Sequence, residues 1–297
     1  MSLAPRVVLV HRTTEYEELT ARHGTHGQAA FYLSSRGRDI AEVHERHRHS
    51  REALASVVSA IPLTWRQARV ERADLDRFLF APEDVVVVVG QDGLVANVAK
   101  YLDGQPVVGI DTDPGRNPGV LVRHRPADAR ALLASAHGGS AEELTMVEAV
   151  ADDTQRLVAL NEIYLGAAGH QTARYRLGLD EYGGAVEPQA SSGVLVGTGT
   201  GATGWIRSVW QERGERLALP GPTDERLLWF VREAWPSPAT GTSLVSGELT
   251  GAGRLSLTVE SDRLIVFGDG MEGDAVELVW GQTVHVGVAG VRLRLVR

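Results

Sequence analysis

Hydrophobic residues in the first part of the chain follow the periodicities of alternating strands and helices. Residues 84–89 give the strongest strand signal, because five consecutive valines are apolar on both faces, as in a central parallel strand. Over residues 38–61, apolar positions recur at helical spacing and end near Pro62. Further strands are predicted at residues 5–11, 65–70 (a weak edge strand) and 106–110, and further helices at residues 94–102, 127–137 and from within residues 13–27. This alternation predicts an α/β domain.

The pattern changes near residue 125, after which short β-type runs separated by turn residues dominate. They lie at residues 145–150, 157–165, 173–179, 193–196, 244–249, 255–259, 264–267, 276–279, 284–288 and 291–296. Helices are predicted only at residues 205–213 and 224–234, and loops at residues 183–192 and 236–242. Closely spaced strands with such turns predict an antiparallel sandwich. We therefore expect two domains, residues 1–125 and 126–297, with the last residues packing back on the first domain.

Composition and charge narrow the class of protein. The 297 residues carry a net charge of −8 and no cysteine, and the purest apolar run has only strand length. The charge argues against a broadly basic nucleic-acid surface, and the missing cysteine excludes disulfides, thiolate metal sites and a cysteine nucleophile. Neither a membrane-spanning run nor a signal-peptide pattern is found in the sequence. We therefore expect a cytoplasmic protein with no nucleic-acid or membrane partner.

The first candidate site is the string Gly90-Gln91-Asp92-Gly93, directly after the predicted central strand. In open α/β sheets, ligands bind beyond the carboxyl ends of the strands, where glycine allows close backbone approach and a carboxylate faces the crevice. The same string is also typical of a tight turn that uses Asp-Gly for its dihedral angles. Taken alone, it allows both interpretations.

The second candidate lies in residues 191–205, where four glycines alternate with hydroxyl residues in a loop between a predicted strand and a predicted helix. Free N–H groups at a helix N-terminus attract anions, so this loop is a candidate phosphate cradle. Residues 199–204 also match the Gly-x-Gly-x-x-Gly dinucleotide fingerprint. That interpretation requires an acidic residue ending a second strand about 20 residues later. Because residues 216–222 end in turn residues without an acid, a dehydrogenase is disfavoured.

Two further features are less specific. Residues 160–162, Leu-Asn-Glu, lie at the start of a predicted strand after a hairpin. Their amide and carboxylate either belong to an ordinary surface or bind a base edge and ribose hydroxyls. His44, His47 and His49 share a predicted helix, which allows either a metal site or a solvated polar face. Hydrolase motifs such as Gly-x-Ser-x-Gly and His-Glu-x-x-His do not occur.

Taken in order, three of these segments resemble the motifs of the NAD kinase family: residues 90–93, residues 160–162 and residues 198–205. The similarity is closer to the mitochondrial-type branch, which residues 106–121, 192–201 and 45–49 also resemble. The resemblance implies a Rossmann-like α/β domain of the NAD kinase and diacylglycerol kinase type, followed by a β-rich domain, with the site between them. It also implies a homodimer or homotetramer.

The activity implied by the resemblance is transfer of a phosphoryl group from ATP to the 2′-hydroxyl of the adenosine ribose of NAD. Asp92 would accept or orient the hydroxyl proton, and magnesium would arrive with ATP rather than at a dedicated metal site. The residues implied to bind substrate are Gly93, Asn161, Glu162, Thr203, Gly204, Trp205 and Ser208. Those implied to bind phosphate are Gly90, Gln91, Thr198, Gly199, Thr200 and Gly201.

Several positions depart from the family pattern. Gln91 replaces a glycine, Leu94 and Ala202 replace hydroxyl residues, and Gly204-Trp205 replaces Ala-Tyr. These departures leave two alternatives open. The protein would be a kinase acting on another nucleoside, sugar or lipid hydroxyl, or a non-catalytic regulator that binds NAD or NADP.

Overall fold

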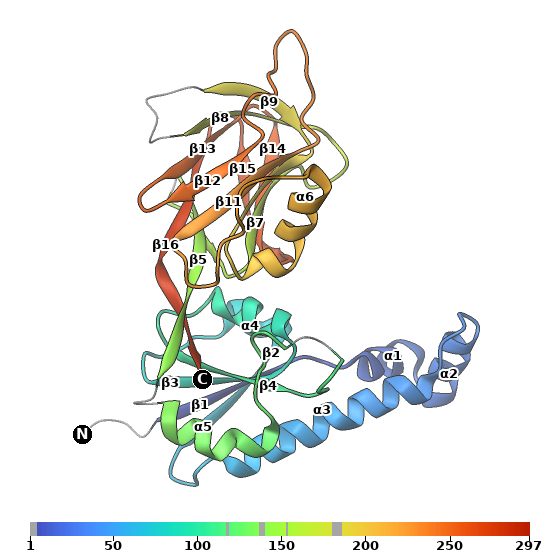
Figure 1. Ribbon diagram of the computed structural model, residues 1–297. Coiled ribbons are helices and arrows are strands. Elements are labelled where there is room, and N and C mark those ends of the chain that lie inside the picture. The colour runs from blue at the N-terminus through green and yellow to red at the C-terminus, as the bar shows by residue number, and fades with distance from the viewer. Residues whose placement is uncertain (1–4, 117–118, 137–139, 153, 180–185) are drawn as a thin grey trace. The chain divides into compact units, whose positions relative to one another are not determined.

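Figure 1 shows the computed structural model, which describes residues 5–116, 119–136, 140–152, 154–179 and 186–297. The chain forms two compact units. One contains Met1–Glu142 and Arg294–Arg297, and the other contains Glu143–Leu293. No helix in these described stretches is both long and apolar enough to cross a membrane.

The first unit contains a parallel sheet with the strand order β2-β1-β3-β4. These strands are β1 (Arg6–His11), β2 (Arg66–Glu71), β3 (Asp84–Gly90) and β4 (Pro106–Asp111). As predicted from its valines, β3 is central and buried on both faces, and β2 lies at the edge. The end of β16 continues the sheet beside β4, where Arg294 and Leu295 pair in parallel with Pro106 and Val107. All four carboxyl ends therefore meet at one edge, where ligands bind in such sheets.

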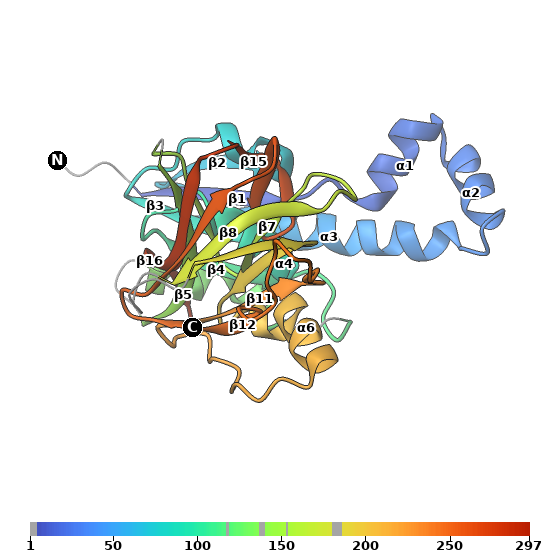
Figure 2. The same ribbon diagram turned by 90° about the horizontal axis from the view of Figure 1, so that it is seen from above.

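Helices cover both faces of this sheet (Figure 1). The long helix α3 (Ile40–Ala60) and α5 (Ala129–Ala136) pack on one face, and α4 (Asp92–Ala99) lies on the other. The predicted helix start near residue 13 becomes α1 (Glu15–His23), because Thr14 and Glu17 form a capping box. Helices α1 and α2 (His26–Ser34) pack on the amino-terminal part of α3, away from the sheet (Figure 2). Two short 3-10 turns, η1 (Arg72–Arg77) and η2 (Pro126–Asp128), complete the unit.

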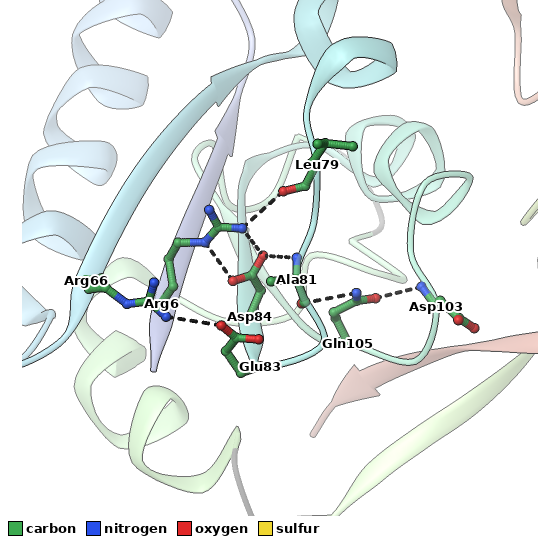
Figure 3. Close-up of polar contacts among 8 residues, drawn as sticks. All are labelled: Arg6, Arg66, Leu79, Ala81, Glu83, Asp84, Asp103 and Gln105. Atoms are coloured by element: carbon green, nitrogen blue, oxygen red, sulfur yellow. Dashed lines mark hydrogen bonds and ion pairs between the residues drawn. The ribbon is translucent and has the colours of Figure 1, made fainter. Parts of the chain in front are cut away.

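A buried ion pair ties the amino ends of β1 and β3 together (Figure 3). The guanidinium of Arg6 donates to both carboxylate oxygens of Asp84, at 2.7 and 2.6 Å. Asp84 is 1% exposed and also accepts a hydrogen bond from the backbone of Ala81 at 2.7 Å. Bidentate pairing and the extra amide satisfy a charge that burial alone would strongly disfavour. The amino ends of these two strands are therefore held together by side-chain contacts.

The second unit contains two antiparallel sheets. One has the order β16-β13-β8-β9, with β5 paired to β16 and β6, and the other has the order β12-β11-β10-β7-β14-β15. Their strands are β5 (Ala141–Ala151), β6 (Arg156–Ala159), β7 (Glu162–Gly166), β8 (Ala173–Leu179), β9 (Glu187–Ser191), β10 (Gly193–Gly197), β11 (Arg226–Arg232), β12 (Ser246–Thr250), β13 (Arg254–Val259), β14 (Arg263–Gly268), β15 (Met271–Val279) and β16 (Thr283–Val296). Leu165 and Trp229 of one sheet share a core with Tyr175 and Leu257 of the other. The predicted sandwich is thus confirmed.

The helix predicted at residues 224–234 is wrong, because these residues form β11. A short run that is apolar at every position fits a buried helix and a strand buried on both faces equally well. In the structure, Leu227, Trp229 and Val231 enter the core between the sheets, while Leu228 and Phe230 pack under α6 (Trp205–Arg213). This run is therefore a strand that is buried on both faces.

Three other elements differ from the predictions. The strand expected at residues 157–165 is broken into β6 and β7 by a turn at residues 160–161. The loop expected at residues 183–192 contains β9, and the two strands expected at the C-terminus are the single strand β16. Residues 183–185 of that loop, residues 117–118 of the segment resembling the mitochondrial-type branch and residue 137 of the helix at 127–137 lie outside the described residues.

Candidate functional site

Asp92 is the first residue of α4, immediately beyond the carboxyl end of β3. Its Oδ1 accepts hydrogen bonds from the backbone N–H groups of Leu121 and Val122, at 2.8 and 2.9 Å, and its Oδ2 accepts one from Val120 at 2.8 Å. A carboxylate has about four acceptor positions, so Oδ2 retains room for one more donor. The carboxylate is therefore fixed in orientation and can still bind a hydroxyl group.

The other residues of this motif surround the start of α4. Gln91 is the N-cap residue and is exposed, so the side chain that replaces the family's glycine meets no obstacle. Gly93 is also exposed, and a Cβ there would have no neighbour within 4 Å. At Gly90, a Cβ would lie 3.1 Å from Cδ2 of Leu94, a tight approach to the residue that replaces the usual hydroxyl. The motif thus forms an open strand-to-helix turn with one immobilised carboxylate.

In the second unit, Asp269 holds the turn at residues 160–162. Its Oδ2 accepts from the N–H of Leu160 at 2.8 Å, and its Oδ1 accepts from those of Asn161 and Glu162, at 2.7 and 3.4 Å. The backbone N–H of Asp269 in turn donates to the carbonyl of Glu162 at 3.1 Å. Asp269 adopts a φ of 54° in the tight turn between β14 and β15, a conformation that aspartate tolerates better than most residues.

Thr198 holds the same turn by donating hydrogen bonds to the backbone carbonyl groups of the turn. Its hydroxyl donates to the carbonyl of Leu160 at 2.6 Å, and its N–H donates to that of Asn161 at 2.9 Å. The hydroxyl also accepts from the N–H groups of Thr200 and Gly201, at 3.1 and 3.3 Å. Because Thr198 is fully buried and its hydroxyl is engaged within the protein, it orders the glycine-rich loop from inside. The phosphate-binding role expected of this hydroxyl stays a prediction.

Two glycines of this loop allow its backbone to lie very close to the backbone of neighbouring segments. A Cβ at Gly201 would lie 2.3 Å from the carbonyl oxygen of Asn161, and one at Gly199 would lie 1.9 Å from that of Gly221. Neither contact is possible for a larger residue without moving backbone. Thr200 lies between them, 3% exposed, and its hydroxyl is buried without a hydrogen-bond partner in the described structure. The loop therefore contacts the 160–162 turn directly, and one of its hydroxyl groups remains unsatisfied.

The remaining predicted substrate residues lie at the start of α6. Thr203, Gly204 and Ser208 are exposed, and the hydroxyl of Thr203 donates to the carbonyl of Thr200 at 2.9 Å. Trp205 is half-buried and stacks on Tyr164, with ring centroids 5.7 Å apart and planes 19° apart. These residues share the second unit with Asn161 and Glu162, whereas Gly90, Gln91, Asp92 and Gly93 belong to the first.

Glu162 has an unusual electrostatic environment. Burial and the neighbouring carboxylate of Asp269 raise the pKa of Glu162 to about 8. A carboxyl group with such a pKa is mostly protonated at neutral pH, so it can donate a hydrogen bond as well as accept one. Glu162 therefore lies beside Asp269 as a mostly neutral carboxyl group at neutral pH.

The histidines singled out in the sequence occupy the α1–α3 region. Tyr16 packs against His44 and His47, with centroids 4.8 and 5.0 Å away, and Nδ1 of His47 lies 2.8 Å from the hydroxyl of Thr14. Burial lowers the pKa of His47. In the described part of the chain, no group of three or more His, Cys, Asp and Glu side chains could hold a metal ion.

Sequence reasoning missed Asp269 and the amide donors of residues 120–122. A signal for Asp269 exists, because Gly268-Asp269-Gly270 stands between two apolar runs and is typical of a tight hairpin turn. Nothing local marks this turn as the partner of residues 160–162, which lie more than 100 positions earlier in the chain.

Known proteins resemble this chain in both sequence and fold. No family model matches it. NAD kinase 2, mitochondrial, is 25% identical over 252 residues in both Rattus norvegicus and Homo sapiens, covering 67% of this chain and 59% and 57% of those proteins. The Xenopus tropicalis protein of that name is 24% identical over 295 residues, covering 77% of this chain and 67% of its own. The match thus spans less than two thirds of the rat and human relatives.

Among solved structures, an NAD kinase from Archaeoglobus fulgidus in complex with ATP matches with a TM-score of 0.59 and 17% sequence identity. The match covers 98% of this chain and 93% of that one, so it includes both units. The family resemblance predicted from the motifs is therefore confirmed: in sequence the chain is similar to the mitochondrial NAD kinase 2 proteins, and its fold is that of an NAD kinase.

Proposed function

We propose that this protein is an NAD kinase, which transfers the γ-phosphoryl group of ATP to the 2′-hydroxyl of the adenosine ribose of NAD. The observation that carries the proposal is the geometry of Asp92. Its carboxylate is aimed by three backbone N–H groups and keeps one acceptor position for a hydroxyl, at the edge of the sheet where ligands bind. Similarity to proteins named NAD kinase 2 supports the choice of reaction.

In this reaction the ribose 2′-oxygen forms a bond to the γ-phosphorus of ATP while the bond to the bridging oxygen of ADP breaks. The transferring group is loosely bonded in the transition state, so positioning and charge neutralisation dominate catalysis. Asp92 orients the 2′-hydroxyl and receives its proton as the bond to phosphorus forms. The immobilised carboxylate loses little freedom in doing so, because its hydrogen bonds already fix its orientation.

Asn161 and Glu162 bind the acceptor nucleotide. Their backbone is held by Asp269 and Thr198, so their side chains act from a fixed frame. An amide group offers both donor and acceptor atoms to a base edge, and a protonated carboxyl adds a donor for a ribose or ring atom. Trp205 adds an aromatic surface for stacking a base, and Thr203 and Ser208 are exposed residues near it in the chain.

The glycine-rich loop binds phosphate groups through Thr198, Gly199, Thr200 and Gly201, together with Gly90 and Gln91 of the first motif. The unsatisfied hydroxyl of Thr200 supports this role, because a phosphate oxygen is a strong acceptor for it. Magnesium enters as the MgATP substrate.

Three coarser properties complete the proposal. The first unit is the nucleotide-binding domain and the second unit the substrate-binding domain. Their boundary lies at residue 142 and not at residue 125, because α5 packs on the first sheet, and the C-terminal residues belong to the first unit. The pairing of Arg294 and Leu295 with β4 supports that last point. The protein acts as a homodimer or homotetramer, and its location is the cytoplasm.

The proposal is tested by incubating purified protein with NAD and MgATP and measuring NADP with an NADP-specific dehydrogenase. A parallel panel of other nucleoside, sugar and lipid hydroxyl acceptors is followed by ADP release. We expect NADP to form and the other acceptors to react far more slowly. If the folded protein binds ATP but phosphorylates a different acceptor, that acceptor would replace NAD in the scheme. Calorimetric binding of NAD without any turnover would instead make it a regulator.

A further inference from the structure

Asp269 lies outside the motifs by which the family resemblance is recognised, yet it makes more contacts with the 160–162 turn than any of them. Its two carboxylate oxygens accept from three consecutive N–H groups, and its own N–H returns a hydrogen bond to Glu162. All these residues belong to the second unit. Such a network does more than stabilise the fold, because it also determines where the side chains of the turn begin.

We propose that Asp269 is a positioning residue for the acceptor substrate, which fixes Asn161 and Glu162 in the geometry that binds the nucleotide. The inference rests on the proposed function in one respect, because it takes these two side chains as the acceptor-binding groups. It adds the residue that controls them, and it makes a prediction about the form in which Glu162 binds.

In the 160–162 turn, the backbone groups are engaged in hydrogen bonds within the protein, whereas in the described part of the chain the side chains of Asn161 and Glu162 are not. Asp269 satisfies the N–H groups of the turn, and Thr198 satisfies the carbonyls of Leu160 and Asn161. The polar backbone groups are thus saturated from two sides, while the side chains of Asn161 and Glu162 make no hydrogen bond or ion pair within the described residues. A turn built this way presents its side chains to a ligand instead of using them for its own stability.

The conformation of Asp269 supports a dedicated role. Its φ of 54° lies in the left-handed region, which is strained for most residues and less so for asparagine, aspartate and glycine. Next to it, a Cβ at Gly268 would lie 2.6 Å from the Cβ of Ala159, so the turn packs closely against the end of β6. The carboxylate thus makes its hydrogen bonds to the three N–H groups from a left-handed backbone conformation.

The same carboxylate sets the charge of Glu162. Glu162 pairs with Gly197 of the neighbouring strand β10. Asp269, which directly follows β14, is the residue whose carboxylate acts on Glu162. Together with burial, this negative neighbour raises the pKa of Glu162 to about 8. Glu162 therefore binds the acceptor in its neutral form, as a hydrogen-bond donor, and loses this ability as the pH rises through its pKa.

The experiment compares Asp269→Asn and Asp269→Gly with wild type in the NAD phosphorylation assay. Both residues tolerate the left-handed conformation, but asparagine turns one acceptor oxygen into a donor that faces a backbone N–H, and glycine removes the acceptors. We expect KM for NAD to rise about tenfold or more while KM for ATP changes by less than about twofold. In wild type, kcat/KM for NAD falls above about pH 8, and in Asp269→Asn this fall moves to lower pH because a negative neighbour is lost.

Asp262→Asn is the matched control. Asp262 is an exposed aspartate in the turn that precedes β14, so its substitution removes the same charge without touching the 160–162 turn. It should leave both KM values and the pH profile unchanged. Partial unfolding alone would lower the active fraction, and so kcat, but would not change KM for NAD selectively or shift the pH profile.

Three outcomes would overturn the inference: folded Asp269 variants with an unchanged KM for NAD, an unchanged alkaline limb in Asp269→Asn, or failure of both variants to fold, which would make Asp269 a structural residue only. If the wild type does not phosphorylate NAD, the proposed function fails on its own. The inference is then tested without turnover, by amide hydrogen exchange. Exchange at residues 160–162 should be faster in Asp269→Asn and unchanged in Asp262→Asn, and equal rates in all three proteins would reject it.

Discussion

Two aspartates, one in each unit, hold a loop by the same device, but the loops differ in what their side chains offer. Asp92 accepts from the N–H groups of residues 120–122, and Asp269 accepts from those of residues 160–162. In both cases the two oxygens of one carboxylate accept from three consecutive backbone N–H groups. Hydrogen bonds to a charged group are stronger than neutral ones, so each carboxylate fixes its loop firmly.

The difference lies in the residues that are held. Residues 120–122 are Val, Leu and Val, and Leu121 and Val122 are buried, so this loop contributes apolar packing and no reactive group. At Asp92 the carboxylate itself is therefore the chemically useful group, and the loop orients it. Residues 161–162 are Asn and Glu, so at Asp269 the useful groups belong to the turn, and the carboxylate orients them. In the proposed function, the same arrangement of hydrogen bonds would thus serve catalysis in one unit and substrate binding in the other.

The largest effect is expected when Asp92 is changed. Asp92→Asn keeps the size of the side chain but removes the charge that receives the hydroxyl proton, and general base catalysis by one group contributes about 10²–10⁴-fold. We expect kcat for NADP formation to fall in that range while KM for NAD changes little. Asp103→Asn, at an exposed aspartate of the same unit, is the control. If Asp92→Asn instead raised KM selectively, Asp92 would act as Asp269 does, and the contrast between the two would disappear.

The charge state of Glu162 gives the next largest effect, measured on stability. Its pKa in the folded protein is about 8, above the ordinary value of 4.5, so the unfolded chain loses its proton first as pH rises. The contribution of Glu162 to the free energy of unfolding is therefore complete at pH values below the pKa of the unfolded chain. It is lost as the pH rises through the pKa of the folded protein. A tenfold difference in proton affinity between the folded and unfolded chains is equivalent to about 1.4 kcal/mol, so wild type should lose about 2–4 kcal/mol from this group between about pH 4 and pH 8.

Glu162→Gln isolates this effect because glutamine is neutral at every pH. Urea unfolding should give the variant and wild type similar stability near pH 4.5, and the variant should be the more stable of the two near pH 8. Glu143→Gln, at an exposed glutamate of β5, should follow wild type throughout. A difference between Glu162→Gln and wild type that does not change with pH would mean that the pKa of Glu162 is the same in the folded and unfolded chains.

The central strand, the edge strand, the long helix and the sandwich were predictable from the sequence, because each depends on a local pattern of apolar residues. The first motif was recognisable because strand, glycine and aspartate are adjacent in the chain. The strand β11 was not, since a run such as residues 227–231 that is apolar throughout has no period to distinguish helix from strand. Burial on two sides decided its conformation, and only the tertiary structure supplies both neighbours.

The partners of the candidate site were not predictable for a related reason. Hydrogen bonds from residues 120–122 to Asp92 and from residues 160–162 to Asp269 connect positions 28 to 109 apart. Backbone N–H groups are the donors, so no side-chain type marks them. Thr198 has a similar long-range partner, because its buried hydroxyl donates to the carbonyl of Leu160, 38 positions earlier, which the glycine-rich loop alone does not indicate.

Gly201 tests how closely the second loop must approach the turn that Asp269 holds. In Gly201→Ala, the new Cβ would lie 2.3 Å from the carbonyl oxygen of Asn161, and forced overpacking against backbone costs about 1–3 kcal/mol. We expect lower stability and a higher KM for NAD. Gly204→Ala restores the residue usual in the family, and its Cβ would have 3.8 Å to the nearest atom. An equal loss in both variants would show that the loop, and not its contact with Asn161, is sensitive to a side chain.

Thr198→Val gives the smallest expected effect. It tests whether the 160–162 turn needs hydrogen bonds to its carbonyl groups as well as to its N–H groups. Valine keeps the shape of threonine but leaves the carbonyl of Leu160 without its hydroxyl donor and the N–H of Thr200 without its acceptor. A buried polar group left unpaired costs about 1–3 kcal/mol, and we expect a value near the lower end because the carbonyl of Asn161 keeps its backbone donor. Thr250→Val, at an exposed position of β12, controls for the substitution itself in urea unfolding. If Thr198→Val also raised KM for NAD as far as Asp269→Asn does, the carbonyl side of the turn would matter as much as the amide side. The 160–162 turn would then need two supports to place Asn161 and Glu162, whereas Asp92 needs only the hydrogen bonds that it receives.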